Sequence, residues 1–194
     1  GTAEGTVNTT VSWIFYPSDR VIAHEFGHNL GLLHAMSATC AGTSSHVPEN
    51  IFDPFFDCTG RDEYGDEGDV MGNRLRRISS RNALKVGYLD TSNFTTASAR
   101  LYQLELGRSG IKGIRVPVGS GINGQTVYYW IELREALGLF DTVSEIQVRT
   151  EPYPFFDPLG NSAWASNTLR FKVEDGSTFN TIPITDPYRG IAIG

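Results

Sequence analysis

The spacing of hydrophobic and polar positions changes near residue 90 of the chain. Before it, residues 17–31 (PSDRVIAHEFGHNLG) place apolar side chains at helical spacing, behind Ser18 or Asp19 as an N-terminal cap. The segment of residues 79–90 (SSRNALKVGYLD) has the same features, with a serine cap at its start and a glycine near its end. We therefore expect helices to dominate the first part of the chain.

After that point the pattern is typical of strands. Short segments rich in Val, Ile, Tyr, Phe and Thr are separated by Gly, Asp, Asn and Pro. They lie at residues 99–106, 111–118, 125–133, 143–150, 168–175, 178–184 and 190–193. This spacing predicts a compact antiparallel β-sandwich. The expected fold class is therefore α+β, with a helical core in residues 1–90 and a β-sandwich domain in residues 91–194.

The segment HEFGHNLGLLH, residues 24–34, contains three histidines within a predicted helix and the turn after it. Side chains four positions apart lie about 5 to 6 Å from one another on one helix face, so His24 and His28 can bind one metal ion. Gly31 tolerates the positive φ that ends a helix, which lets the chain turn back and supply His34 as a third ligand. Three protein ligands leave a fourth tetrahedral position for water, the arrangement of catalytic zinc sites.

Glu25 follows the first of these histidines and projects toward the next sector of the helix surface. A carboxylate there can contact a water at the metal without ligating the metal, which is the position of a general base. The simpler alternative is that the histidines only pack on a half-buried helix. That explanation suits a lone histidine better than this combination of residues. We expect zinc as the cofactor and Glu25 as the catalytic residue.

This segment resembles the extended zinc signature of the metzincin metallopeptidases, in which HExxH continues through a glycine to a third histidine. The resemblance implies a tight turn with a methionine beneath the zinc, and Met71 in YGDEGDVMG (residues 64–72) fits that place. Met36 lies too close to His34 for this part. Together with YYWIELREALGLFD at residues 128–141, the methionine segment looks most like the gametolysin group of secreted metzincins. The alternative for Met71 is ordinary core filling.

The resemblance implies that residues 1–90 are the metzincin-like catalytic core of a secreted zinc endopeptidase. Such an enzyme hydrolyses peptide bonds of proteins, here with Glu25 as general base. The rival hypothesis is a non-enzymatic matrix or cell-surface binding module that retains the zinc site as a relic. Metzincins place a sizeable upper subdomain before the zinc helix, whereas only residues 1–23 precede His24. We expect this wall of the cleft to be short or missing, supplied by another polypeptide, or rebuilt from elsewhere in the chain.

Cys40 and Cys58 flank a loop rich in Ser, Gly, Pro and Asp that joins the zinc motif to the methionine segment. A disulfide would close this loop and contribute about 3 kcal/mol to stability. The alternatives are two free buried thiols, or a second metal site, for which neither cysteine has a CxxC partner. The secreted character that the resemblance implies favours the disulfide.

Composition limits the other functions. The 194 residues are 40% hydrophobic, which suffices for one large or two small packed domains, and the formal net charge is -6. The only basic run is RLRR at residues 74–77, so no nucleic-acid partner is expected. No apolar stretch approaches the roughly 20 residues of a membrane span, and no signal peptide is present, so we expect a soluble chain. The acidic run of residues 61–69 predicts a hydrated turn, and nothing indicates an oligomeric state.

Overall fold

The structure is a computed structural model of the chain. It describes residues 3–5, 11–40, 58–102, 109–120, 126–134, 136, 145–150, 166–171, 184–186 and 191–193. The helical elements are α1 (Asp19–Asn29), α3 (Ser80–Lys85) and the 3-10 turn η1 (Thr91–Asn93). The strands are β1 (Ala3–Gly5), β2 (Ser12–Ile14), β3 (His34–Cys40), β4 (Cys58–Asp62), β5 (Phe94–Thr95), β6 (Gly113–Ser120), β7 (Thr126–Arg134), β8 (Glu145–Thr150), β9 (Ser166–Phe171), β10 (Ile184–Asp186) and β11 (Ile191–Ile193).

Both predicted helices begin at the serine caps that their sequences indicate. The Ser18 hydroxyl accepts a hydrogen bond from Val21 N at 3.3 Å, which satisfies one of the free N–H groups at the start of α1. In α3 the Ser79 hydroxyl accepts from Asn82 N at 3.4 Å. Gly31 follows α1 with a φ of 86°, so the predicted reversal after this helix is confirmed.

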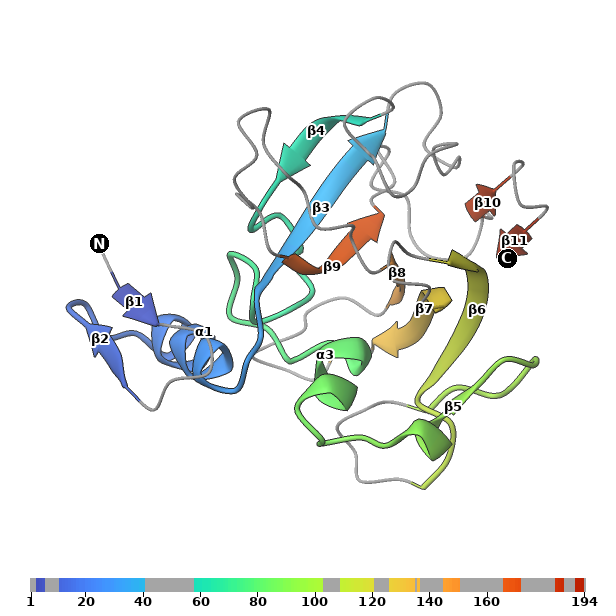
Figure 1. Cartoon of the computed structure of the whole chain (residues 1–194), viewed down its shortest axis with the longest axis horizontal. Coiled ribbons are helices and arrows are strands. Elements are labelled where there is room, and N and C mark those ends of the chain that lie inside the picture. The colour runs from blue at the N-terminus through green and yellow to red at the C-terminus, as the bar shows by residue number, and fades with distance from the viewer. Residues whose placement is uncertain are drawn as a thin grey trace.

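The main sheet has seven strands in the order β4-β3-β9-β8-β7-β6-β5 (Figure 1). The β3–β9 and β5–β6 pairs are parallel, and the remaining neighbours are antiparallel. Two further pairs, β1–β2 and β10–β11, form separate two-stranded sheets. The mixed helix and sheet content agrees with the predicted α+β class. We expected a purely antiparallel sheet, whereas this one contains two parallel pairs.

The sheet also joins strands from both sides of residue 90, because β3 and β4 precede this point and β5 to β9 follow it. Strand β3 pairs with β4 on one edge and with β9 on the other, so both of its backbone edges are hydrogen-bonded. Parallel pairing between segments so far apart leaves no local sequence signal. Much of residues 151–194 lies outside the described residues, and the division at residue 90 and the β-sandwich stay predictions.

A small apolar core joins α1, the start of β3, residues 70–71 and the two sides of α3. Its buried members are Leu32, Ala35, Val70 and Met71, and Ala23, Ile78 and Val86 pack against them. These side chains fix α1 against the first residues of β3. Among the described residues, no helix is long and apolar enough to cross a membrane.

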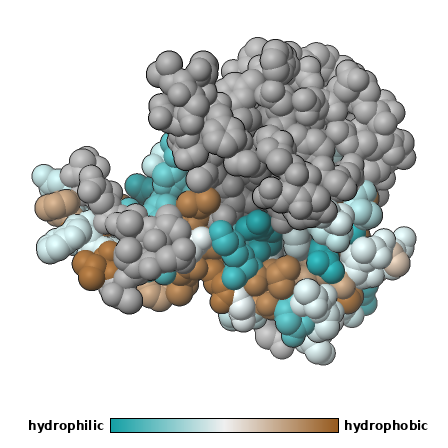
Figure 2. All heavy atoms as spheres, viewed as in Figure 1, coloured by the Kyte–Doolittle hydropathy of each residue, from teal (hydrophilic) through white to brown (hydrophobic). Residues whose placement is uncertain are grey.

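Helix α1 buries its polar side and exposes much of its apolar side. Its buried residues are His24, Glu25, Gly27 and His28. The residues Ile22, Phe26 and Leu30 follow one another at four-residue spacing on the opposite face and are exposed, as is Trp13 of β2. Hydrophobic side chains are accordingly visible at the end of the molecule that carries α1 and β2 (Figure 2). Burial of two histidines and a glutamate costs free energy unless these groups have partners, so the buried side of α1 is the place to look for function.

Candidate metal centre

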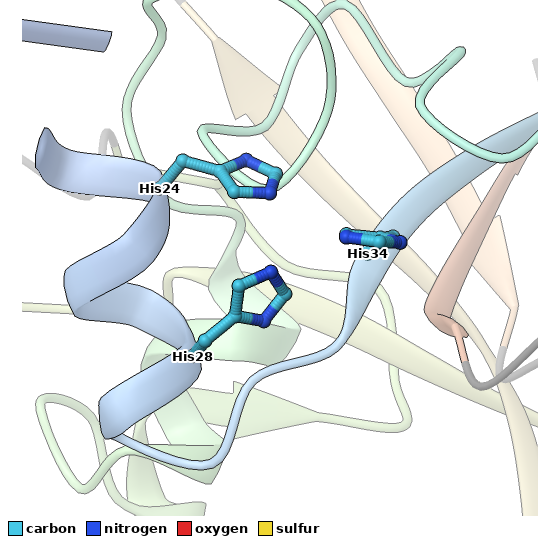
Figure 3. A group of neighbouring side chains, drawn as sticks. All are labelled: His24, His28 and His34. Atoms are coloured by element: carbon cyan, nitrogen blue, oxygen red, sulfur yellow. The ribbon is translucent and has the colours of Figure 1, made fainter. Parts of the chain in front are cut away.

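Three histidine side chains converge between α1 and β3. His24 and His28 lie one turn apart on α1, and His34 is the first residue of β3 (Figure 3). One nitrogen from each ring lies within 4.8 Å of the corresponding atoms of the other two. The ring centroids are 4.8 Å apart for His24 and His28 and 4.9 Å apart for His28 and His34. The structure thus brings together the three residues that the sequence analysis selected as metal ligands.

Each imidazole is oriented by a hydrogen bond at its Nδ1 atom. The acceptors are Val70 O for His24 (3.0 Å), Leu32 O for His28 (2.8 Å) and Glu63 Oε1 for His34. A carbonyl oxygen only accepts, so Nδ1 of His24 and of His28 carries the proton. In a neutral ring, Nε2 then keeps its lone pair for a metal. This pattern of outer contacts is the one found around metal-binding histidines.

Burial keeps two of the rings neutral. Loss of hydration lowers the pKa of His24 from 6.5 to about 4, outweighing its hydrogen bond to Val70, and His28 and His34 lower it further. Burial and the charge of His28 lower the pKa of His34 to about 4 as well. At neutral pH these imidazoles therefore have no proton to lose before they bind a metal.

The carboxylate of Glu25 is buried beside this cluster, and only 7% of the residue is exposed. Its Oε2 atom has no hydrogen-bond partner among the described residues. A buried carboxylate oxygen without a partner is costly, and it fits a group that hydrogen-bonds something bound at the three histidines. Three imidazoles are a donor set that suits zinc among other transition metals and leaves a coordination position open. The residues present therefore fit a catalytic zinc ion.

Two residues of the acidic run were missed as site residues by the sequence analysis, which predicted only a hydrated turn. Glu63 bonds His34, and the Tyr64 ring lies 4.1 Å from the ring of His34 and 5.9 Å from that of His24. Burial, with the charges of Glu63 and Glu25, raises the pKa of Tyr64. Their only sequence signal was their place between the zinc motif and the methionine, because no fixed spacing ties them to the histidines.

Met71 packs directly against α1. Its side chain is fully buried, and its Sδ atom lies 2.3 Å from the position that a Cβ on Gly27 would occupy. Its carbonyl oxygen accepts a hydrogen bond from Ala35 N at 2.9 Å, next to His34. The methionine is thus held between the helix that carries His24 and the strand that begins with His34.

The two cysteines occupy paired positions in the backbone of the β3–β4 hairpin. Cys40 and Cys58 are opposite each other in the antiparallel register, at an irregularity that begins between Thr39 and Cys40. The placement of their side chains lies outside what the structure describes, so the disulfide stays a prediction.

Comparison with known families supports this assignment for the first part of the chain. Residues 2–82 match the family model described as metallo-peptidase family M12B, reprolysin-like. The matched segment contains the three histidines, Glu25 and Met71, and it supports the metzincin resemblance and a zinc metallopeptidase acting on peptides or proteins. The likeness to the gametolysin group is not tested by this match and stays a prediction. Comparisons with curated proteins and with solved structures found no match.

Proposed function

We propose that this chain is a secreted zinc-dependent endopeptidase of the gametolysin type that hydrolyses peptide bonds of proteins. The observation that carries the proposal is the buried cluster on α1 and β3. Three histidines, each fixed through Nδ1, converge beside the unpartnered Oε2 atom of Glu25. The reprolysin-like match over residues 2–82 independently supports a metallopeptidase.

The three imidazoles would hold the zinc ion, which when bound supplies Lewis-acid chemistry toward water and the substrate carbonyl. Glu25 takes a proton from the attacking water as the bond between carbon and oxygen forms. It then delivers that proton to the leaving amine as the bond between carbon and nitrogen breaks, so the protons balance over the cycle. Its place directly after His24 on α1 puts the carboxylate beside the cluster without making it a ligand.

Secretion is part of the proposal, and the cysteines support it. The paired backbone positions of Cys40 and Cys58 suit a disulfide, because facing residues of antiparallel strands have Cα atoms about 4.5 to 5.5 Å apart. Disulfides need Cα separations of about 4.4 to 6.8 Å and persist in oxidising compartments. A bridge between β3, which begins at His34, and β4 is therefore consistent with an extracellular enzyme.

The test replaces Glu25 by glutamine, which preserves the shape of the side chain and removes the base. We expect Glu25→Gln to keep its zinc and its fold and to lose at least about a hundredfold of peptidase activity, the scale of general acid–base catalysis. The assay measures how fast the full-length natural protein hydrolyses an unfolded protein substrate, with and without a chelator.

Glu67→Gln is the matched control. It makes the same chemical change as Glu25→Gln, but on a side chain that is 45% exposed. It should leave the activity unchanged. An equally fast Glu25→Gln enzyme would show that the assigned base is wrong. A zinc-loaded parent that cuts no unfolded protein would instead favour the binding-module hypothesis.

A further inference from the structure

The loop of residues 62–73 supplies outer contacts for two of the three histidines. Val70 O accepts from His24, and Glu63 bonds His34. The orientation of both rings therefore depends on where this loop lies.

The same loop forms hydrogen bonds with both the backbone N–H and the backbone carbonyl of Ala35, the residue next to His34. Ala35 N donates to Met71 O at 2.9 Å, and Asp66 N donates to Ala35 O at 3.1 Å. A shift of the loop would thus be transmitted to the start of β3 as well as to the ring of His24.

A buried ion pair joins the loop to a strand that is distant in the sequence. Arg149 of β8 donates from Nε to Asp66 Oδ2 at 2.6 Å and from Nη2 to Asp66 Oδ1 at 3.1 Å. Both residues are buried almost completely, with exposed side-chain fractions of 1% and 0%. A two-point contact of this kind fixes direction as well as distance, because the guanidinium and carboxylate planes must match.

A second pair on β7 completes a charged cluster, formed by Asp66, Glu132, Arg134 and Arg149. Glu132 accepts from Arg134 Nε at 3.2 Å and also bonds Arg149. Arg134 Nη2 donates to Gly68 O of the loop at 3.1 Å. The cluster holds two carboxylates and two guanidinium groups, and the buried carboxyl group of Asp69 also interacts with Arg149.

The backbone of the loop at Gly68 lies against the side chain of Gln147 on β8. A Cβ atom on Gly68 would lie 2.3 Å from Nε2 of Gln147 and 2.6 Å from its Oε1. A side chain at position 68 would therefore displace the amide of Gln147, which lies between the loop and β8. The ion pair of Asp66 and Arg149 opposes movement of the loop away from the strand.

We propose that Arg149 and Asp66 are a positioning pair. They hold the loop of residues 62–73 in the position that its contacts with His24 and His34 require. A strand of the C-terminal half thereby sets the metal affinity of a site built from the N-terminal half. Buried ion pairs contribute little net stability compared with apolar packing, so a role in geometry explains this one better than a role in stability. The inference rests on the proposed function only in taking the three histidines as zinc ligands.

The experiment compares two substitutions of Arg149 with one control on the same strand. Arg149→Met removes the charge at similar length, and Arg149→Lys keeps the charge but loses the two-point contact. Val148→Ala is the control. Val148 is buried in β8, and because it is adjacent to Arg149 its side chain points to the other face of the sheet. Zinc affinity is measured by competition with a chelator, the absorption spectrum is recorded with cobalt(II), and metal-free unfolding is followed in denaturant.

We expect both Arg149 variants to bind zinc about tenfold to a hundredfold more weakly, the scale seen when outer contacts of metal ligands are lost. Their cobalt(II) spectra should change, because the ligand geometry changes. Val148→Ala should lose stability but keep the affinity and spectrum of the parent. If Arg149→Met fails to fold, Arg149→Lys carries the comparison.

Parent-like zinc affinity and cobalt spectrum in a folded Arg149 variant would overturn the positioning role and leave the proposed function standing. The same holds if Val148→Ala weakens zinc binding as much as the Arg149 variants do for an equal loss of stability. A parent that binds no zinc would overturn the proposed function itself, and with it this inference.

Discussion

At the scale of single residues, the metal centre depends on which atom each histidine leaves free. Each Nδ1 atom is engaged by an oxygen, and only for His34 is that oxygen a side-chain carboxylate, from Glu63. A carboxylate partner raises the basicity of the imidazole and fixes its orientation more strongly than a neutral carbonyl does. Glu63 is also 24% exposed in its side chain, so it can be changed without opening the core.

We therefore predict that Glu63→Gln weakens zinc binding about tenfold without unfolding the protein, because the amide still accepts a hydrogen bond but carries no charge. Chelator competition measures the affinity, and circular dichroism verifies the fold. Glu67→Gln, in the same loop, is the control that should bind zinc as the parent does. Unchanged affinity in Glu63→Gln would mean that His34 needs no charged partner.

At the scale of elements, the β3–β4 hairpin connects the zinc motif to the loop that carries Glu63 and Met71. The paired backbone positions of Cys40 and Cys58 lie at the end of β3 farthest from His34. A covalent link there would limit separation of the two strands and, through them, movement of the loop relative to β3.

We predict that the two cysteines are bridged in the natural protein and that Cys40→Ser with Cys58→Ser lowers the free energy of unfolding by about 2–4 kcal/mol. Closing a loop restricts the unfolded chain, which is the main source of this stabilisation. Peptide mapping without reduction identifies the bridge, and denaturant unfolding measures its contribution. Recovery of both residues as free thiols would argue against the disulfide and the extracellular location alike.

At the scale of the whole molecule, charged residues join the loop of residues 62–73 to strands β7 and β8 of the sheet. Glu132 and Arg134 lie on β7, and their cluster reaches Asp66 in the loop through Arg149 of β8. Burial alone would raise the pKa of Glu132, but Arg134 and Arg149, with hydrogen bonds from Ser80, lower it to about 2. Its charged form is therefore stabilised by folding.

This shift gives a signed dependence of stability on pH. The ordinary pKa of Glu132 is 4.5 and its folded value is about 2, so its contribution is complete above 4.5 and is lost as pH falls toward 2. We predict that metal-free parent protein loses stability more steeply across this range than Glu132→Gln, which has no group to titrate there. Denaturant unfolding of both proteins at several pH values tests this. Equal slopes in parent and Glu132→Gln would contradict it.

The sequence by itself determined the local part of the site. The Ser18 cap, the spacing of His24 and His28 and the reversal at Gly31 all follow from chain geometry over a few residues. That is why the convergence of the three histidines could be predicted before any long-range contact was known.

Only the tertiary structure decided what surrounds those histidines. Glu132 and Arg134 alternate with apolar residues along β7, a pattern that fits a solvated strand face as well as a buried one. Their burial follows from the loop of residues 62–73 lying over that face, and the parallel pairing of β3 with β9 likewise joins distant segments. Such contacts depend on how separate elements pack, because a local pattern records which side chains share a face and not what covers that face.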